Sequence, residues 1–300
     1  VIEGLVEGKL YLNSKGNSSI NSVSINGIDC NYNGSVSGLD SINISSCLEN
    51  VSGSANIVVV TGDKIIESYK FVDNSISSLS APVYVSFISI WNTSISAMTN
   101  NNQIKLPLKS SGSYDFVAFW GDGNSSVITS EDSVNATYTY GSPGVYTVTL
   151  NGYINGFGFN ITKPFHISNS DDSRKLIDIS QWGTIQLGNE GSYFYGCHNL
   201  DISAVDSPDL SLTTNLSGMF SDNFVLNSSL DHWDVSSVID MSEMFYGEAF
   251  NIFNQPLNSW DVSSVINMDG MFRFNSDFNQ PLDNWTTSSV TSMSLSLIHI

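Results

Sequence analysis

A repeated segment in the carboxy-terminal half of the chain limits the possible folds more than any other feature. The string Trp-Asp-Val-Ser-Ser-Val occurs at 233–238 and again at 260–265, each time followed by Met-x-x-Met-Phe, and a third copy begins at Trp285. The successive tryptophans are Trp233, Trp260 and Trp285, so the period is nearly constant. A unit this short cannot bury its own apolar side, so the fixed period indicates an array of stacked units.

The repeats extend towards the amino terminus with decreasing similarity. Met219-Phe220 precedes Met244-Phe245 by almost the same interval, and Tyr193-Phe194 stands one further interval before it. We therefore count four or five units. Propeller blades contain about 40–45 residues and four strands, so these units are too short for a propeller despite their Trp-Asp pairs.

Each unit carries two patterns of apolar spacing. Trp233 and Val235 alternate with polar residues, which predicts a short strand. The residues that follow recur at three- and four-residue spacing, which predicts a short helix with Ser237 and Asp240 as its capping box. The apolar residues of this expected helix are Val238, Met241, Met244 and Phe245.

The repeated polar and apolar positions favour structural roles. Methionines at helical spacing beside phenylalanine, such as Met241 and Met268, are expected to pack in the core. Asn254 and Asn279 recur in the loop of the unit. We expect them to form a ladder that satisfies backbone groups.

Taken together, these motifs resemble a known repeat. Met-Phe, Phe-Asn-Gln-Pro-Leu at 253–257 and 278–282, and Trp-Asp-Val-Ser-Ser-Val look like the repeat of BspA-like bacterial surface proteins, a leucine-rich-repeat-like family. The resemblance covers roughly residues 175–293. It implies a leucine-rich-repeat-like α/β solenoid at 174–293. Ile202–Val205 stands where Trp-Asp-Val is expected, as in an amino-terminal cap.

A second resemblance precedes the repeats. Trp-Gly-Asp-Gly at 120–123, Tyr-x-Tyr at 138–140 and Pro-Gly-Val-Tyr-Thr-Val-Thr-Leu at 143–150 resemble the polycystic-kidney-disease (PKD) domain, a small β-sandwich. We assign residues 81–168 to this module. Asp122 is expected to form the turn between the glycines rather than to bind calcium, which requires six or more oxygen ligands.

Residues 1–80 show short alternating strands separated by Asn-Gly and Gly-Asp turns. This pattern predicts an immunoglobulin-like β-sandwich. Cys30 and Cys47 both belong to this module, and either a disulfide or two buried thiols fits. The fold class predicted for the chain is thus mainly β with short helices, with two sandwich modules before the solenoid.

Composition restricts the partners. With 10 Lys+Arg against 29 Asp+Glu, the chain carries a net charge of −19, which disfavours nucleic acid and anionic membrane surfaces. No run approaches the roughly 18 apolar residues of a membrane span. The chain starts at Val1 and is expected to be a fragment. Residues 294–300 leave the repeat and resemble a translated sequencing adapter, which suggests a non-native tail.

We find no sequence signature of catalysis, of a cofactor or of a metal site. The histidines His166, His198, His232 and His299 have no partner at ligand spacing, and Cys197 fits a small core residue. A nucleophile elbow, a P-loop and a zinc-protease helix are all absent. We therefore predict that the chain is not an enzyme.

Positions that differ between copies are the best candidates for residues that bind a partner. His232, Ser259 and Asn284 precede the three tryptophans, and Tyr246 and Arg273 begin the segment that differs most in length. The BspA-like resemblance implies a cell-surface or secreted protein that binds an extracellular host, matrix or neighbouring-cell protein, with the sandwich modules as a stalk. The alternative is a non-catalytic carbohydrate-binding or spacer part of a secreted hydrolase, with aromatics such as Tyr246 stacking on glycans.

Overall fold

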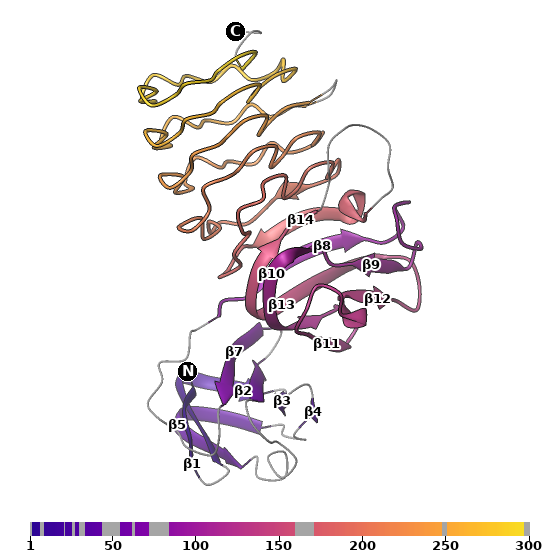
Figure 1. The fold of residues 1–300 in the computed structure, drawn as a ribbon. Coiled ribbons are helices and arrows are strands. Elements are labelled where there is room, and N and C mark those ends of the chain that lie inside the picture. The colour runs from indigo at the N-terminus through magenta and orange to yellow at the C-terminus, as the bar shows by residue number, and fades with distance from the viewer. Residues whose placement is uncertain are drawn as a thin grey trace. The chain divides into compact units, whose positions relative to one another are not determined.

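The computed structural model describes residues 84–159, 171–247 and 251–296, together with the backbone of seven strands before them (Figure 1). The chain divides into two compact units. The first comprises residues 1–86 with 125–127, and the second comprises residues 87–124 with 128–300.

The first unit contains two antiparallel sheets. The three-stranded sheet has the order β1-β2-β5 and the four-stranded sheet the order β4-β3-β6-β7. Their bounds are β1 Ile2–Val6, β2 Lys9–Ile20, β3 Ser22–Ile25, β4 Ile28–Asp29, β5 Gly34–Asn43, β6 Ala55–Thr61 and β7 Lys64–Phe71. Cys30 and Cys47 lie outside the described residues.

A six-stranded sheet of order β11-β10-β13-β8-β14-β15 includes the PKD-like segment. In β8 alternate residues are buried, and Phe87 and Trp91 face the core. β9 and β12 form a separate pair. The bounds are β8 Phe87–Asn92, β9 Gln103–Lys105, β10 Leu108–Phe119, β11 Ser125–Ile128, β12 Thr137–Thr139, β13 Val145–Phe157, β14 Leu176–Gln181 and β15 Asp201–Ile202, with 3-10 helices η1 Val134–Ala136 and η2 Ser173–Lys175.

This sheet continues into the repeats. β14, the first strand of the repeat region, pairs antiparallel with β8 and parallel with β15. The segments predicted as residues 81–168 and 174–293 therefore share one sheet, and they lie in one compact unit from Phe87 onwards.

Asp122 forms a turn, accepting hydrogen bonds from the Asn124 amide at 3.0 Å and from the Tyr138 hydroxyl at 2.7 Å.

The predicted fold class was wrong in its helices and in its α/β solenoid. Among the described residues there is no α-helix, only the two short 3-10 helices, so this part of the chain is mainly β and turns. Residues 238–245, expected to be helical, contain an isolated bridge at Asp240 and a turn at 242–245. Asp240 does not take part in a capping box with Ser237; its carboxylate accepts from the Ser242 amide at 2.8 Å.

The backbone explains the absence of the helix. The amides of Met241, Glu243 and Phe245 donate to the next copy, at Asn267, Asp269 and Met271, over 2.8–2.9 Å. Those amides are not available for bonds to the fourth residue before them, which a helix requires. Glu243 also has a φ of 55°, which interrupts any right-handed helix.

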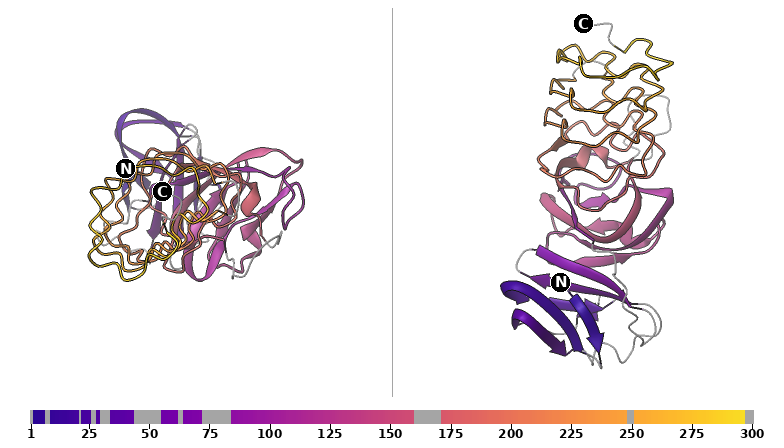
Figure 2. Two further views of the ribbon diagram at one scale, coloured as in Figure 1. Left: turned by 90° about the horizontal axis from the view of Figure 1, so that it is seen from above. Right: turned by 90° about the vertical axis from the view of Figure 1, so that its left-hand side faces the viewer.

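Successive repeats lie one above another as coils (Figure 2). Parallel bridges join Asn215 to Asp240, Asp240 to Asn267, and Asn267 to Ser292. The expected asparagine ladder is confirmed, because Asn227 accepts from the Asn254 amide at 3.1 Å and Asn254 from the Asn279 amide at 2.9 Å.

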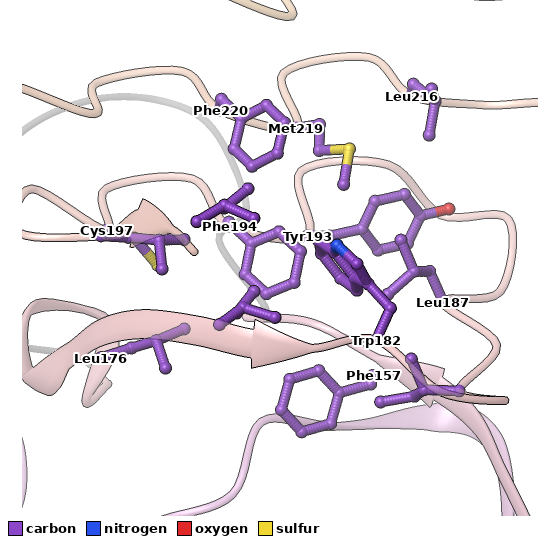
Figure 3. Close-up of a cluster of buried hydrophobic side chains, with 14 of the residues drawn as sticks. Phe157, Leu176, Trp182, Leu187, Tyr193, Phe194, Cys197, Leu216, Met219 and Phe220 are labelled. Carbon is purple, nitrogen blue, oxygen red and sulfur yellow. The ribbon is translucent and has the colours of Figure 1, made fainter. Parts of the chain in front are cut away.

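The interior of the coils is a stack of aromatic rings. Phe194, Phe220, Phe245 and Phe272 are fully buried, and neighbouring rings in this series stack at 5.9, 5.9 and 5.5 Å between centroids. Figure 3 shows the start of this series, with Phe194 above Trp182 and Phe157 of the sheet. The expected core packing of the repeated methionines is confirmed at four positions that are at most 1% exposed: Met241, Met244, Met268 and Met271.

The predicted tail at 294–300 lies partly outside the described residues. Its first residues still follow the coil, because the Gly270 amide donates to the Ser294 carbonyl at 2.8 Å. Leu295, with φ of 57°, repeats the left-handed conformation of Glu243 and Gly270.

Two buried tyrosines predict loss of stability at high pH. Tyr114 donates to the Lys109 and Gly156 carbonyls, and Tyr193 to those of Gly188 and Asn215. Burial raises the pKa of each to about 12. Because the folded state holds these protons more tightly than the unfolded chain, the free energy of unfolding should fall as the pH rises from about 10 through 12.

Urea unfolding at a series of pH values, together with tyrosinate absorbance, measures this effect. Tyr114→Phe should be less stable at neutral pH but lose less stability on alkalinisation than the parent. An equal loss in both proteins would contradict the assignment to Tyr114.

Candidate functional site

The described residues contain no group of three or more His, Cys, Asp or Glu side chains arranged to hold a metal ion. Cys197 is completely buried, and burial raises the pKa of its thiol well above the usual value. Burial also lowers the pKa of His198, whose ring stacks on Phe224 at 4.2 Å. His166 and His299 lie outside the described residues.

The three predicted positions before the tryptophans, His232, Ser259 and Asn284, are all exposed. The Ser259 amide donates to the Asp231 carboxylate and the Asn284 amide to the Asn258 side chain, both at 3.0 Å. His232 contacts the Asp206 carbonyl through Nε2 at 3.3 Å. Each of the three residues is thus held by the coil before it.

His232 and Ser259 line the same open groove of about 600 Å³. Asp231, Asp234 and Asp261 also line it, which makes it acidic. Hydrogen bonds from Ser236 lower the pKa of Asp234, and those from Ser263 lower the pKa of Asp261. These carboxylates therefore stay ionised at neutral pH, and the groove disfavours anions.

The other two predicted residues are brought together by the stacking of coils. Tyr246 and Arg273 come from successive copies, and the Arg273 guanidinium carbon lies 5.9 Å from the centre of the Tyr246 ring. It lies 4.8 Å from the ring of Phe274, which in turn meets Tyr246 edge-on at 5.7 Å. We call Tyr246, Arg273 and Phe274 the Arg273 cluster.

Phe274, the most unusual member of this cluster, was not predicted from the sequence. Its side chain is 48% exposed and its φ is 61°. This left-handed conformation costs a bulky residue about 1–2 kcal/mol. Gly196 and Asp222 occupy the equivalent places in earlier coils, with φ of 69° and 54°. The sequence signal that could have identified Phe274 is the occurrence of phenylalanine at a position where other copies carry glycine or aspartate.

The Arg273 cluster carries a positive charge in a repeat region that is otherwise strongly acidic. After Lys175 the sequence contains one basic Lys or Arg side chain, Arg273, against fifteen carboxylates. An arginine flanked by two aromatic rings has the composition of an interface hot spot. The cluster can therefore offer an apolar contact and a guanidinium to the same partner.

No helix in the described part of the chain has the length and apolarity needed to cross a membrane.

No curated protein and no solved structure is significantly similar to the chain. A family described as "Mycoplasma protein of unknown function, DUF285" matches residues 166–252 and 224–298. The repeat region is therefore similar to this family, a finding compatible with the BspA-like resemblance, whereas the PKD-like and leucine-rich-repeat resemblances remain predictions.

Proposed function

We propose that the chain is a non-catalytic, secreted or cell-surface protein whose stacked repeats bind another extracellular protein. The Arg273 cluster carries this proposal. Aromatic and arginine side chains contribute much of the energy of protein interfaces, and here the exposed Phe274 and the half-buried Tyr246 and Arg273 come from two successive coils. The β-rich modules before the repeats serve as a stalk.

The charges on the surface of the coils indicate which kind of partner protein they would bind. The exposed carboxylates of the coils favour a surface with basic residues, since electrostatic complementarity speeds association and excludes other partners. Arg273 favours one carboxylate at the centre of the contact, to which a guanidinium can donate two hydrogen bonds. Phe274 supplies the adjoining apolar contact.

Arg273→Met and Phe274→Asp should each weaken capture of the partner by about 30-fold, because a hot-spot residue contributes about 2 kcal/mol or more. Phe274→Asp should leave the free energy of unfolding within about 1 kcal/mol of the parent, since it removes left-handed strain. Asp222 shows that aspartate adopts the same conformation in this fold. The full chain is immobilised and exposed to extracellular protein extracts, and affinity for the captured protein is measured for each variant.

Ile266→Ala is the matched control, because Ile266 is an exposed apolar residue of the same coil. Capture that survives both cluster variants would refute a role for the cluster. A parallel glycan array distinguishes the alternative: binding of glycans without any protein would favour a carbohydrate-binding accessory, and binding of neither by the folded chain would favour a spacer.

A further inference from the structure

A second pocket lies within the unit formed by residues 87–124 and 128–300, and it shares no lining residue with the Arg273 cluster or the acidic groove. It has a volume of about 370 Å³ and is lined by residues of β10, β13 and the first two repeats. This volume falls within the range of about 300–1,000 Å³ found for small-molecule sites. The polar residues that matter for its chemistry are Lys109, Ser111, Asn155, Asn189, Glu190 and Asp209.

The carboxylate of Glu190 is held in place at this pocket. Ser111 donates to its Oε1, and the ammonium of Lys109 lies 3.7 Å from its Oε2. Lys109 is itself only 3% exposed and also donates to the Phe159 carbonyl at 2.9 Å. Burial lowers the pKa of Lys109, whereas the charge of Glu190 favours its protonated form. The Glu190 side chain is 39% exposed, and a carboxylate with a partner at each oxygen is oriented to accept further hydrogen bonds.

Two amide side chains of the pocket keep unused hydrogen-bonding groups. Within the described residues, the side-chain amide of Asn155 makes no hydrogen bond, although the residue is half-buried. Asn189 accepts from Thr214 and Asn215 through its oxygen, which leaves its NH₂ group available. The pocket thus combines free donors and acceptors with a fixed carboxylate.

The charges of the pocket disfavour anions and metal cations. Glu190 and Asp209 outnumber Lys109 in a chain of net charge −19, which disfavours anions. The ammonium of Lys109 disfavours a metal cation, and the described residues hold no group of three metal-ligating side chains. A neutral ligand with many hydroxyl groups remains, because each hydroxyl both donates and accepts.

We propose that this pocket binds a small neutral polyol of monosaccharide type, with Glu190 accepting from two hydroxyls and Asn155 and Asn189 bonding to others. The site is separate from the Arg273 cluster and does not depend on the proposed protein-binding function. It also differs from aromatic stacking on glycans at Tyr246.

The test uses the full chain and isothermal titration with glucose, galactose and N-acetylglucosamine, and with inorganic phosphate and calcium as charged probes. At least one sugar should bind saturably. Asn155→Leu and Glu190→Gln should each weaken that binding by about tenfold, the loss of about one hydrogen bond. Asn279→Leu, the same kind of change at an exposed position of the coils, should leave it unchanged.

Circular dichroism confirms that each variant is folded. Absence of binding by all three sugars, equal binding by Asn155→Leu, Glu190→Gln and the parent, or preferential binding of phosphate or calcium would overturn the proposal. Arg273→Met should bind sugar normally, so failure here and failure of the protein-binding function are distinguishable.

Discussion

Replacing Phe245 by Ala is expected to lower the free energy of unfolding by about 3–5 kcal/mol, the usual cost of removing a buried phenylalanine. The ring is fully buried and stacks on Phe220 at 5.9 Å, Phe253 at 4.3 Å and Phe272 at 5.5 Å. Each aromatic pair adds about 0.5–1.5 kcal/mol beyond the area that it buries. The variant leaves a cavity between coils that are otherwise joined by backbone hydrogen bonds, such as the one from the Phe245 amide to the Met271 carbonyl at 2.8 Å.

Urea unfolding followed by intrinsic fluorescence measures this change. Ile239→Ala is the control, because Ile239 is 42% exposed and its truncation should change stability by no more than about 0.5 kcal/mol. Domains typically have only about 5–15 kcal/mol of stability, so Phe245→Ala should shift the midpoint visibly. A loss below about 1 kcal/mol would show that the ring series does not hold the coils together.

Lys175→Met is the second change expected to have a large effect. It should lower the free energy of unfolding by about 3–5 kcal/mol, because it leaves the buried carboxylate of Asp172 without its cationic partner. Lys175 is completely buried and its Nζ lies 3.4 Å from the Asp172 carboxylate. It also donates to the carbonyls of Thr99, Asn100 and Gln103 over 2.8–3.1 Å. Asp172 in turn accepts from the amides of Thr99 and Lys105.

These contacts attach the start of the repeats to the loop between β8 and β9, so the variant tests how strongly the two segments are coupled. Denaturant unfolding of Lys175→Met, Asp172→Leu and the double variant gives the coupling energy between the two side chains. The double variant should be more stable than the sum of the single losses predicts, since no isolated charge is then buried. Strict additivity would be inconsistent with a direct Asp172–Lys175 interaction.

Much of the interior could be predicted from the repeat. The buried tryptophans, methionines and phenylalanines recur at fixed intervals, and a fixed interval puts equivalent residues at equivalent depths in successive coils. The asparagine ladder followed from the same reasoning. Among the candidate site residues, the spacing of copies identified Tyr246 and Arg273 separately, but not that their side chains meet.

The helices were predicted wrongly because apolar spacing of three and four residues does not specify a helix by itself. Met241, Met244 and Phe245 have the same spacing in a segment whose regular part is a single turn at 242–245. What differs is the destination of the backbone amides, and the Met241 and Phe245 amides donate to Asn267 and Met271 of the next coil. Hydropathy carries no information about that choice.

The sequence by itself determined the period, the residues that face inward, the β-rich character and the strongly acidic surface, because each depends on local spacing or on composition. Only the tertiary structure decided that the coils are built from turns, that Phe274 joins Tyr246 and Arg273, and that Ser111 and Lys109 fix Glu190 beside Asn155. The physical reason is the same in each case: these features arise from hydrogen bonds and contacts between residues that lie far apart in the sequence, which no local pattern encodes.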